Sequence, residues 1–205
     1  MSRDHATSDS DSALSEDSAG GEATEVSGRF RRVSVGFTER VDAVPPDGWD
    51  APAPCEGWVA RDVVRHLVEW FPPFFLTIWE VPQPVVPSVD DDPAGAWAAV
   101  RDALQDALDD PDVEARERDT PLGSSFATAI ATGAIPDVLI HTWDLARAAG
   151  LDETLDADEI SRIAASIDEM PFEAMESSGH YGPRVPTAAG ADDQTRVLNA
   201  FGRTP

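Results

Sequence analysis

The sequence has no lysine and only one cysteine, Cys55, among its 205 residues. A single cysteine excludes a disulfide within the chain. No apolar run approaches the about 18 residues that a membrane helix needs. The first residues also lack the basic-then-apolar pattern of a signal peptide. We therefore expect a cytoplasmic protein that has no membrane partner.

Basic residues of any kind are scarce. The 15 basic residues are all arginines and face 39 acidic residues, which gives a formal net charge of -24. Residues 1–28 hold only seven of the acids and one of the arginines, so most of the excess charge belongs to the rest of the chain. Such a surface repels polyanions, and we expect neither nucleic acid nor an anionic membrane as a partner.

The chain divides into a polar tail and one folded domain. Residues 1–28 are mainly Ser, Asp, Glu, Ala and Gly and offer little to bury, which predicts a disordered acidic tail. Over residues 29–205 apolar side chains recur every three or four positions, and no strand pattern of useful length is present. This predicts an all-α domain with about four main helices and additional short ones. The predicted helices cover 29–44, 59–71, 92–109, 125–149, 156–168 and 194–201.

Prolines interrupt two of these predicted helices. Pro72 and Pro73 are expected to stop or bend the helix that reaches them, and Pro136 lies inside the apolar segment 125–149. Proline lacks the amide donor and clashes with the preceding turn, so Pro136 either kinks the helix or begins a new one. Asp137 then falls in the first turn after the break, where a carboxylate is favoured by the helix dipole.

Three side chains suggest a metal site. Asp137 and His141 are four residues apart and therefore share one face of a helix. His66 lies in the inward stripe of 59–71 and is a candidate third ligand. Two histidines and a carboxylate suit zinc, and also iron or nickel, and three protein ligands leave a position for water or substrate. The alternative is that His66 is a core histidine with satisfied hydrogen bonds and Asp137 caps its helix.

Two further residues have more than one possible role. Asp144, three residues beyond His141, could replace Asp137 as a ligand, accept a hydrogen bond from the liganding imidazole, or pair with Arg147 at the surface. Cys55 could be a nucleophile or a thiol near the metal, although a lone cysteine in an apolar loop is more often a small buried residue.

The catalytic candidates are Arg147, Arg184 and His180. Either arginine could clamp a substrate carboxylate through a two-pronged hydrogen bond. His180 and Arg184 lie in a Gly/Pro-rich segment that could fold over the mouth of the bundle. The alternative is an ordinary surface loop.

Three parts of the sequence match motifs of a known group. The first is WDAPAPCEGW at 49–58 followed by RDVVRHLV at 61–68, and the second is DVLIHTWDLARA at 137–148. These resemble the mycothiol-dependent maleylpyruvate isomerase-like proteins, an actinobacterial group in the DinB-like superfamily of metal-binding helical bundles. The ending of the chain is similar to that of one uncharacterised branch, in GPRVP at 182–186, QTRVL at 194–198 and FGR at 201–203. The resemblance covers about residues 30–203 and implies a DinB-like four-helix bundle with additional short helices and a C-terminal extension.

The resemblance also implies a site and an activity. By position it assigns metal ligands to His66 and His141, and to Asp137 where a glutamate is common. The shorter aspartate side chain keeps Asp144 open as the acidic ligand. Relatives with a known role use zinc and mycothiol or a similar low-molecular-weight thiol. This implies a thiol-dependent transferase or isomerase in which a metal-bound thiolate attacks a small electrophilic substrate. The alternatives are a non-catalytic metal- or ligand-binding stress protein and a metal-dependent hydrolase.

Overall fold

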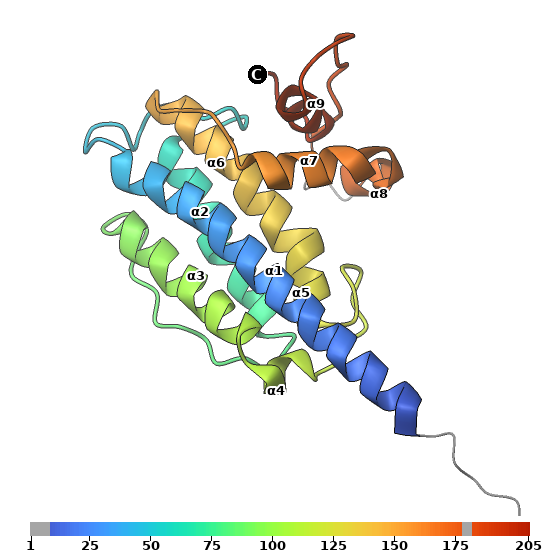
Figure 1. Ribbon diagram of the computed structural model, residues 1–205. Helices are drawn as coiled ribbons and strands as arrows, with labels where there is room; N and C mark the ends of the chain where they lie inside the picture. Colours follow the sequence, from blue (N-terminus) through green and yellow to red (C-terminus); the bar gives the residue numbers. More distant parts are fainter. Residues whose placement is uncertain (1–8, 178–181) are drawn as a thin grey trace, which may run out of the picture.

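The computed structural model describes residues 9–177 and 182–205 of the chain, and these are helical with connecting loops (Figure 1). The predicted all-α class is confirmed, and no named strand is found within the described ranges. The helices before the last apolar segment are α1 (Asp9–Ala43), α2 (Ala60–Phe71), η1 (Pro72–Leu76), α3 (Pro93–Leu108) and α4 (Pro111–Glu114). The remaining ones are α5 (Phe126–Ala129), η2 (Ile130–Ala134), α6 (Ile135–Ala149), α7 (Ala157–Ser166), η3 (Ile167–Glu169), α8 (Phe172–Ser177) and α9 (Asp193–Ala200).

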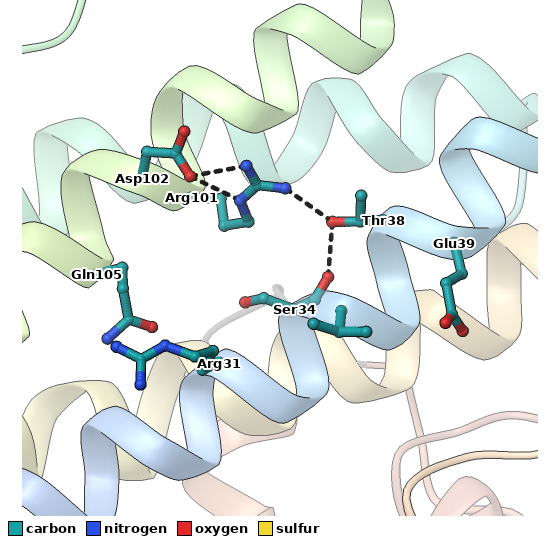
Figure 2. A pocket seen from close by; sticks show the side chains of 8 residues that line it. Arg31, Ser34, Thr38, Glu39, Arg101, Asp102 and Gln105 are labelled. Carbon is teal, nitrogen blue, oxygen red and sulfur yellow. Dashed lines mark hydrogen bonds and ion pairs between the residues drawn. The ribbon is translucent and has the colours of Figure 1, made fainter.

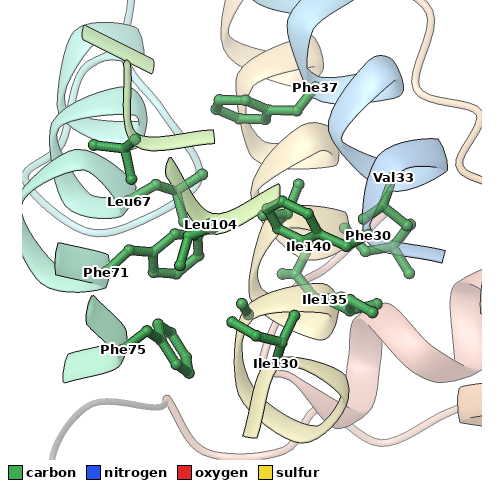
Figure 3. Packing of buried hydrophobic residues seen from close by; sticks show 14 of the residues in the cluster. Phe30, Val33, Phe37, Leu67, Phe71, Phe75, Leu104, Ile130, Ile135 and Ile140 are labelled. Atoms are coloured by element: carbon green, nitrogen blue, oxygen red, sulfur yellow. The ribbon is translucent and has the colours of Figure 1, made fainter. Parts of the chain in front are cut away.

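Four helices form the bundle. α1 packs against α3 and α6, and α2 packs against the same two helices, so α1 and α2 occupy opposite corners (Figure 1). Aromatic and aliphatic side chains from these helices and from η1 and η2 fill the interior, as Figure 3 shows. The labelled residues of this core include Phe30, Phe37, Leu67, Phe71, Phe75, Leu104 and Ile140. The apolar side chains that recur every three or four positions therefore face the core, as predicted.

α1 is longer than predicted. It begins at Asp9, so part of the segment predicted as a disordered tail is helical. Val26 is 2% exposed and lies four residues before Phe30, which extends the apolar stripe by one turn toward the N-terminus. The Ser27 hydroxyl, which is also buried, donates a hydrogen bond to Asp109 at the end of α3. Packing of the bundle thus starts before residue 29.

The chain stays helical across both proline positions because each is accommodated by a widened turn. Pro72 opens η1, a π-helical turn whose amide at Thr77 bonds back to the Pro72 carbonyl. η2, another π-helical turn, ends two residues before Pro136. A widened turn relieves the clash that a proline causes in a regular helix. α5, η2 and α6 therefore follow one another without a loop, and the expected break at Pro136 is a π turn.

The two π turns pack against each other at a glycine. A Cβ atom built on Gly133 in η2 would lie 3.0 Å from Cζ of Phe75 in η1 and 2.6 Å from Cδ1 of Leu122. Only a residue without a side chain permits this approach. The contact joins η2, which leads into α6, to η1, which follows α2, and α2 and α6 carry the candidate ligands.

The C-terminal helices lie beside the bundle (orange to dark red in Figure 1). α7 packs against α9, and α7 is joined to α1 by an ion pair between Arg29 and Glu159. The two arginine nitrogens lie 3.0 and 2.6 Å from the Glu159 carboxylate, which is 1% exposed. Among the described residues, no helix combines the length and the apolar character needed to cross a membrane.

Candidate metal centre

His66, Asp137 and His141 meet where α2 packs against α6. Nε2 of His66 lies 3.3 Å from Oδ2 of Asp137, and Nε2 of His141 lies 3.4 Å from Oδ1 of the same carboxylate. One nitrogen or oxygen from each of the three residues lies within 4.8 Å of the others. The structure therefore brings together the three side chains that the sequence singled out.

The carboxylate of Asp137 is held by a second contact from α2. Nε1 of Trp70, one turn after His66, donates a hydrogen bond of 2.8 Å to Oδ2 of Asp137. Burial alone would raise the pKa of this carboxyl group, but the neighbouring His141 and His66 rings outweigh it. The pKa of Asp137 consequently lies well below its ordinary value. Asp137 is thus an ionised carboxylate held in a fixed orientation.

Asp144 lies on the other edge of the His141 ring. Its Oδ2 atom is 2.8 Å from Nδ1 of His141, whereas Asp137 faces Nε2. This contact lacks the geometry of a hydrogen bond, so it is an ion pair. Of the two candidate acidic ligands, only Asp137 lies on the same edge of His141 as His66.

His141 is buried between two carboxylates. Burial lowers the pKa of an imidazole, but Asp137 and Asp144 more than compensate and raise the pKa of His141 to about 9. The environment of this ring therefore stabilises positive charge. A cation-binding site needs the same property.

Arg203 is a residue that the sequence interpretation missed. Its guanidinium group forms a two-pronged ion pair with Asp144, with Nη2 2.7 Å from Oδ2 and Nε 3.2 Å from Oδ1. The same Nη2 lies 3.3 Å from Sγ of Cys55. Arg203 belongs to the FGR motif at 201–203, which was noted only as part of the resemblance. The motif drew attention to Arg203, but the sequence did not show that its partner would be Asp144.

Cys55 forms a second group with His141 and Asp144 that has the composition of a metal site. Arg203 already places a positive charge against both the thiol and the carboxylate. Burial, followed by the charge of Asp144, raises the pKa of the Cys55 thiol to about 12. This group is therefore an arginine-centred cluster, and its thiol is protonated at neutral pH.

The loop between α1 and α2 covers the site. Backbone hydrogen bonds from Ala53 to Trp58 and from Ala60 to Ala51 fold it into a narrow turn. This places the Trp58 ring parallel to that of His141, with centroids 5.8 Å apart, and tilted against His66 at 5.2 Å. The side chain of His66 remains 31% exposed, whereas that of His141 is 5% exposed. Solvent can therefore reach the site on the His66 side.

The two catalytic candidates that the structure describes, Arg147 and Arg184, have contacts other than the three side chains. Arg147 is paired with Glu153 at 2.7 Å and stacks over the Trp143 ring, and it lines a surface hollow of about 360 Å³ together with Arg203. Arg184 is exposed and stacks over the ring of Phe172 in α8. His180 lies outside the described residues.

A separate hollow of about 300 Å³ lies between α1 and α3 (Figure 2). Figure 2 shows Arg101 joined to Asp102 and to Thr38, with Ser34, Gln105 and Arg31 beside them. None of the candidate ligands lines this hollow, since they lie on α2 and α6. It is not part of the candidate metal centre.

Comparison with known proteins identifies the family. The family model described as the mycothiol maleylpyruvate isomerase N-terminal domain matches residues 30–146, which include all three candidate ligands and exclude Arg203. No curated protein and no solved structure matches the chain. The matched region is more than half of the 205 residues. The chain therefore belongs to the mycothiol maleylpyruvate isomerase N-terminal domain family.

Proposed function

We propose that the chain binds a divalent cation, zinc in the first instance, through His66, Asp137 and His141. With a low-molecular-weight thiol such as mycothiol, it would act as a transferase or isomerase on a small electrophilic substrate. The observation that carries the proposal is the convergence of Nε2 of both histidines on the carboxylate of Asp137. The choice of a thiol as cosubstrate is supported by membership of the mycothiol maleylpyruvate isomerase N-terminal domain family.

The donor set fits the cation. Two imidazole nitrogens and one carboxylate oxygen are typical zinc ligands, and three protein ligands leave a position for a further molecule. All three ligands lie on helices, and two of them have a further partner. Trp70 donates a hydrogen bond to Asp137, and Asp144 contacts Nδ1 of His141. Outer contacts of this kind orient metal ligands and support their affinity.

The chemistry of the site points to an external thiol. A bound divalent cation lowers the pKa of a coordinated thiol and so favours the thiolate, which is the nucleophilic form. The only thiol of the chain, Cys55, has its pKa raised to about 12 and contacts Asp144 and Arg203 rather than Asp137. Cys55 is therefore poorly suited to this role, which supports a thiol supplied from solution.

The side chains of the site divide the remaining tasks. Trp58 covers the His141 ring and limits water on that side, while His66 marks the open edge through which a thiol and an electrophile would enter. Addition to a conjugated double bond would form a bond between the thiol sulfur and the electrophilic carbon and break the C=C π bond. The π electron pair would move onto the substrate as an enolate, which would take up the proton lost by the thiol. Isomerisation would follow from rotation about the new single bond and reversal of the addition, which regenerates the free thiol.

The proposal is tested by thiol dependence. Zinc-loaded protein is incubated with a panel of small electrophiles, including maleylpyruvate, with and without mycothiol. We expect turnover only with the thiol, and its loss in Asp137→Asn. Turnover with water alone would instead indicate a hydrolase. Zinc binding without turnover of any electrophile would indicate a binding protein.

A further inference from the structure

Arg203 and Asp144 form a charge pair that joins the C-terminal segment to α6. Asp144 is 0% exposed, and Arg203 is 14% exposed. The arginine contacts both oxygens of the carboxylate across 59 positions of sequence. Burying a carboxylate costs free energy unless it is paired, and the guanidinium group of Arg203 supplies the opposite charge that Asp144 needs.

The backbone after α9 directs Arg203 toward this contact. Gly202 has a φ of +80°, and its amide bonds to the Asn199 carbonyl, while the Arg203 amide bonds to the Leu198 carbonyl. A Cβ atom at Gly202 would lie 3.1 Å from the Pro183 carbonyl oxygen in the preceding segment. The turn is thus fixed by a helix cap that favours glycine. Nη1 of Arg203 is also held by the Phe201 carbonyl at 2.8 Å.

Asp144 transmits the contact to the metal centre. Its Oδ2 atom, which lies 2.7 Å from Arg203, also lies 2.8 Å from Nδ1 of His141. A carboxylate at Nδ1 favours the ring tautomer that keeps its proton there and leaves Nε2 free for a cation. Arg203 contacts both oxygens of Asp144 and so holds the carboxylate beside His141.

We propose that Arg203 is a positioning residue for the metal centre, which acts by holding Asp144 against the Nδ1 edge of His141. The inference rests on the proposed metal site. It adds the C-terminal segment, which the family match does not reach, to the structure that sets the affinity of the site.

Cobalt binding measures this role without any substrate. The metal-free full-length chain is titrated with Co²⁺, and the visible absorption spectrum reports both the affinity and the geometry of the ligands. Replacing outer partners of metal ligands typically weakens binding by about 10–100-fold. We expect Arg203→Gln to weaken Co²⁺ binding by about tenfold and to change the spectrum.

Arg196→Gln is the matched control. Arg196 lies in α9 and forms an exposed ion pair with Asp193, so its replacement should leave affinity and spectrum unchanged. Arg203→Lys keeps the charge but not the two-pronged geometry, and we expect an intermediate affinity. It also serves if Arg203→Gln does not fold, as judged by circular dichroism.

A double-mutant cycle with Asp144→Asn tests whether Arg203 acts through Asp144. Asp144→Asn should weaken Co²⁺ binding, and adding Arg203→Gln to it should cause less than a further twofold loss. If Arg203→Gln weakened Co²⁺ binding by the same factor with and without Asp144→Asn, the proposal would be overturned. Unchanged or tighter binding with an unchanged spectrum in folded Arg203→Gln or Arg203→Lys would also overturn it. Failure of the wild-type chain to bind Co²⁺ would contradict the proposed function itself, and this inference with it.

Discussion

Nδ1 of His141 lies 2.8 Å from Oδ2 of Asp144, one helical turn further along α6. Nε2 of the same ring faces Asp137 on the opposite side, at 3.4 Å. The two aspartates that the sequence left as rival ligands thus face different nitrogens of one imidazole. Their replacement should have different consequences.

Asp137 and Asp144 are distinguished by replacing each with asparagine. Loss of Asp144 should weaken zinc binding by about 10–100-fold, as expected for an outer partner of a liganding histidine. Loss of Asp137 should weaken it further, because a donor atom is replaced. Competition with a chromophoric chelator measures both affinities. Glu69→Gln, an exposed carboxylate on α2, is the control. A larger effect from Asp144→Asn would reverse the two roles.

Cys55 should react slowly with iodoacetamide in the folded protein. Its pKa is raised to about 12, chiefly by burial and then by Asp144, so the thiolate that reacts is scarce at pH 8. Unfolding in guanidinium returns the thiol to its ordinary pKa, roughly 8.5. We expect alkylation at pH 8, followed by mass spectrometry, to be at least about 100-fold faster in the unfolded chain. Equal rates in the two states would contradict the raised pKa of this partly buried thiol.

The Arg29–Glu159 pair should contribute to stability because it is buried. Arg29 is 11% exposed and Glu159 is 1% exposed, so Arg29→Gln leaves a buried carboxylate poorly compensated. We expect the free energy of unfolding to fall by about 3 kcal/mol in denaturant titrations.

Arg31→Gln provides the control two residues away. Arg31 forms an exposed ion pair with Asp109, and its loss should change stability by less than about 1 kcal/mol. A similar fall in the free energy of unfolding of the two variants would show that burial does not make the Arg29–Glu159 pair more stabilising than an exposed one.

Alanine replacements at Gly133 and Gly36 are a second matched pair of variants. Alanine at 133 would place its Cβ against Phe75 and Leu122, and we expect a loss of about 1–2 kcal/mol from the overpacked contact. At Gly36 in α1 a Cβ atom would meet nothing within 4 Å beyond its chain neighbours and the backbone of its own helix, so alanine should stabilise the helix by roughly 0.5–1 kcal/mol. Thermal unfolding of both variants tests the prediction. A gain in stability at 133 would contradict the close approach of the two π turns.

Helical periodicity predicted most of the fold because local apolar spacing determines which face a helix buries. The stripe through Phe30 and Phe37 and the one through Leu67 both face the core as expected. The helical start of α1 was missed because the polar composition of 1–28 outweighed its few apolar residues, Val26 among them. The π turns near Pro72 and Pro136 were also missed, since a proline signals a disturbed turn without saying how the chain adapts.

The candidate site was predictable where its residues are neighbours in sequence. Asp137 and His141 share a helix face by their spacing alone, while His66 needed its place in an inward stripe. Arg203 could not be placed in the same way, because 59 residues separate it from Asp144 and only the packed fold brings the two together. The hydrogen bond from Trp70 to Asp137 depends on the mutual orientation of α2 and α6, which residue spacing within one helix does not specify.

The zinc content of purified wild-type protein and of His141→Ala tests the central claim most directly. Both are freed of metal by a chelator, equilibrated with Zn²⁺, desalted and analysed by mass spectrometry of the metal, with circular dichroism confirming the fold. Bound zinc near one ion per wild-type chain and close to none in folded His141→Ala is the predicted result. The same zinc content in the two proteins, or no zinc in either, would contradict a metal centre at His66, Asp137 and His141.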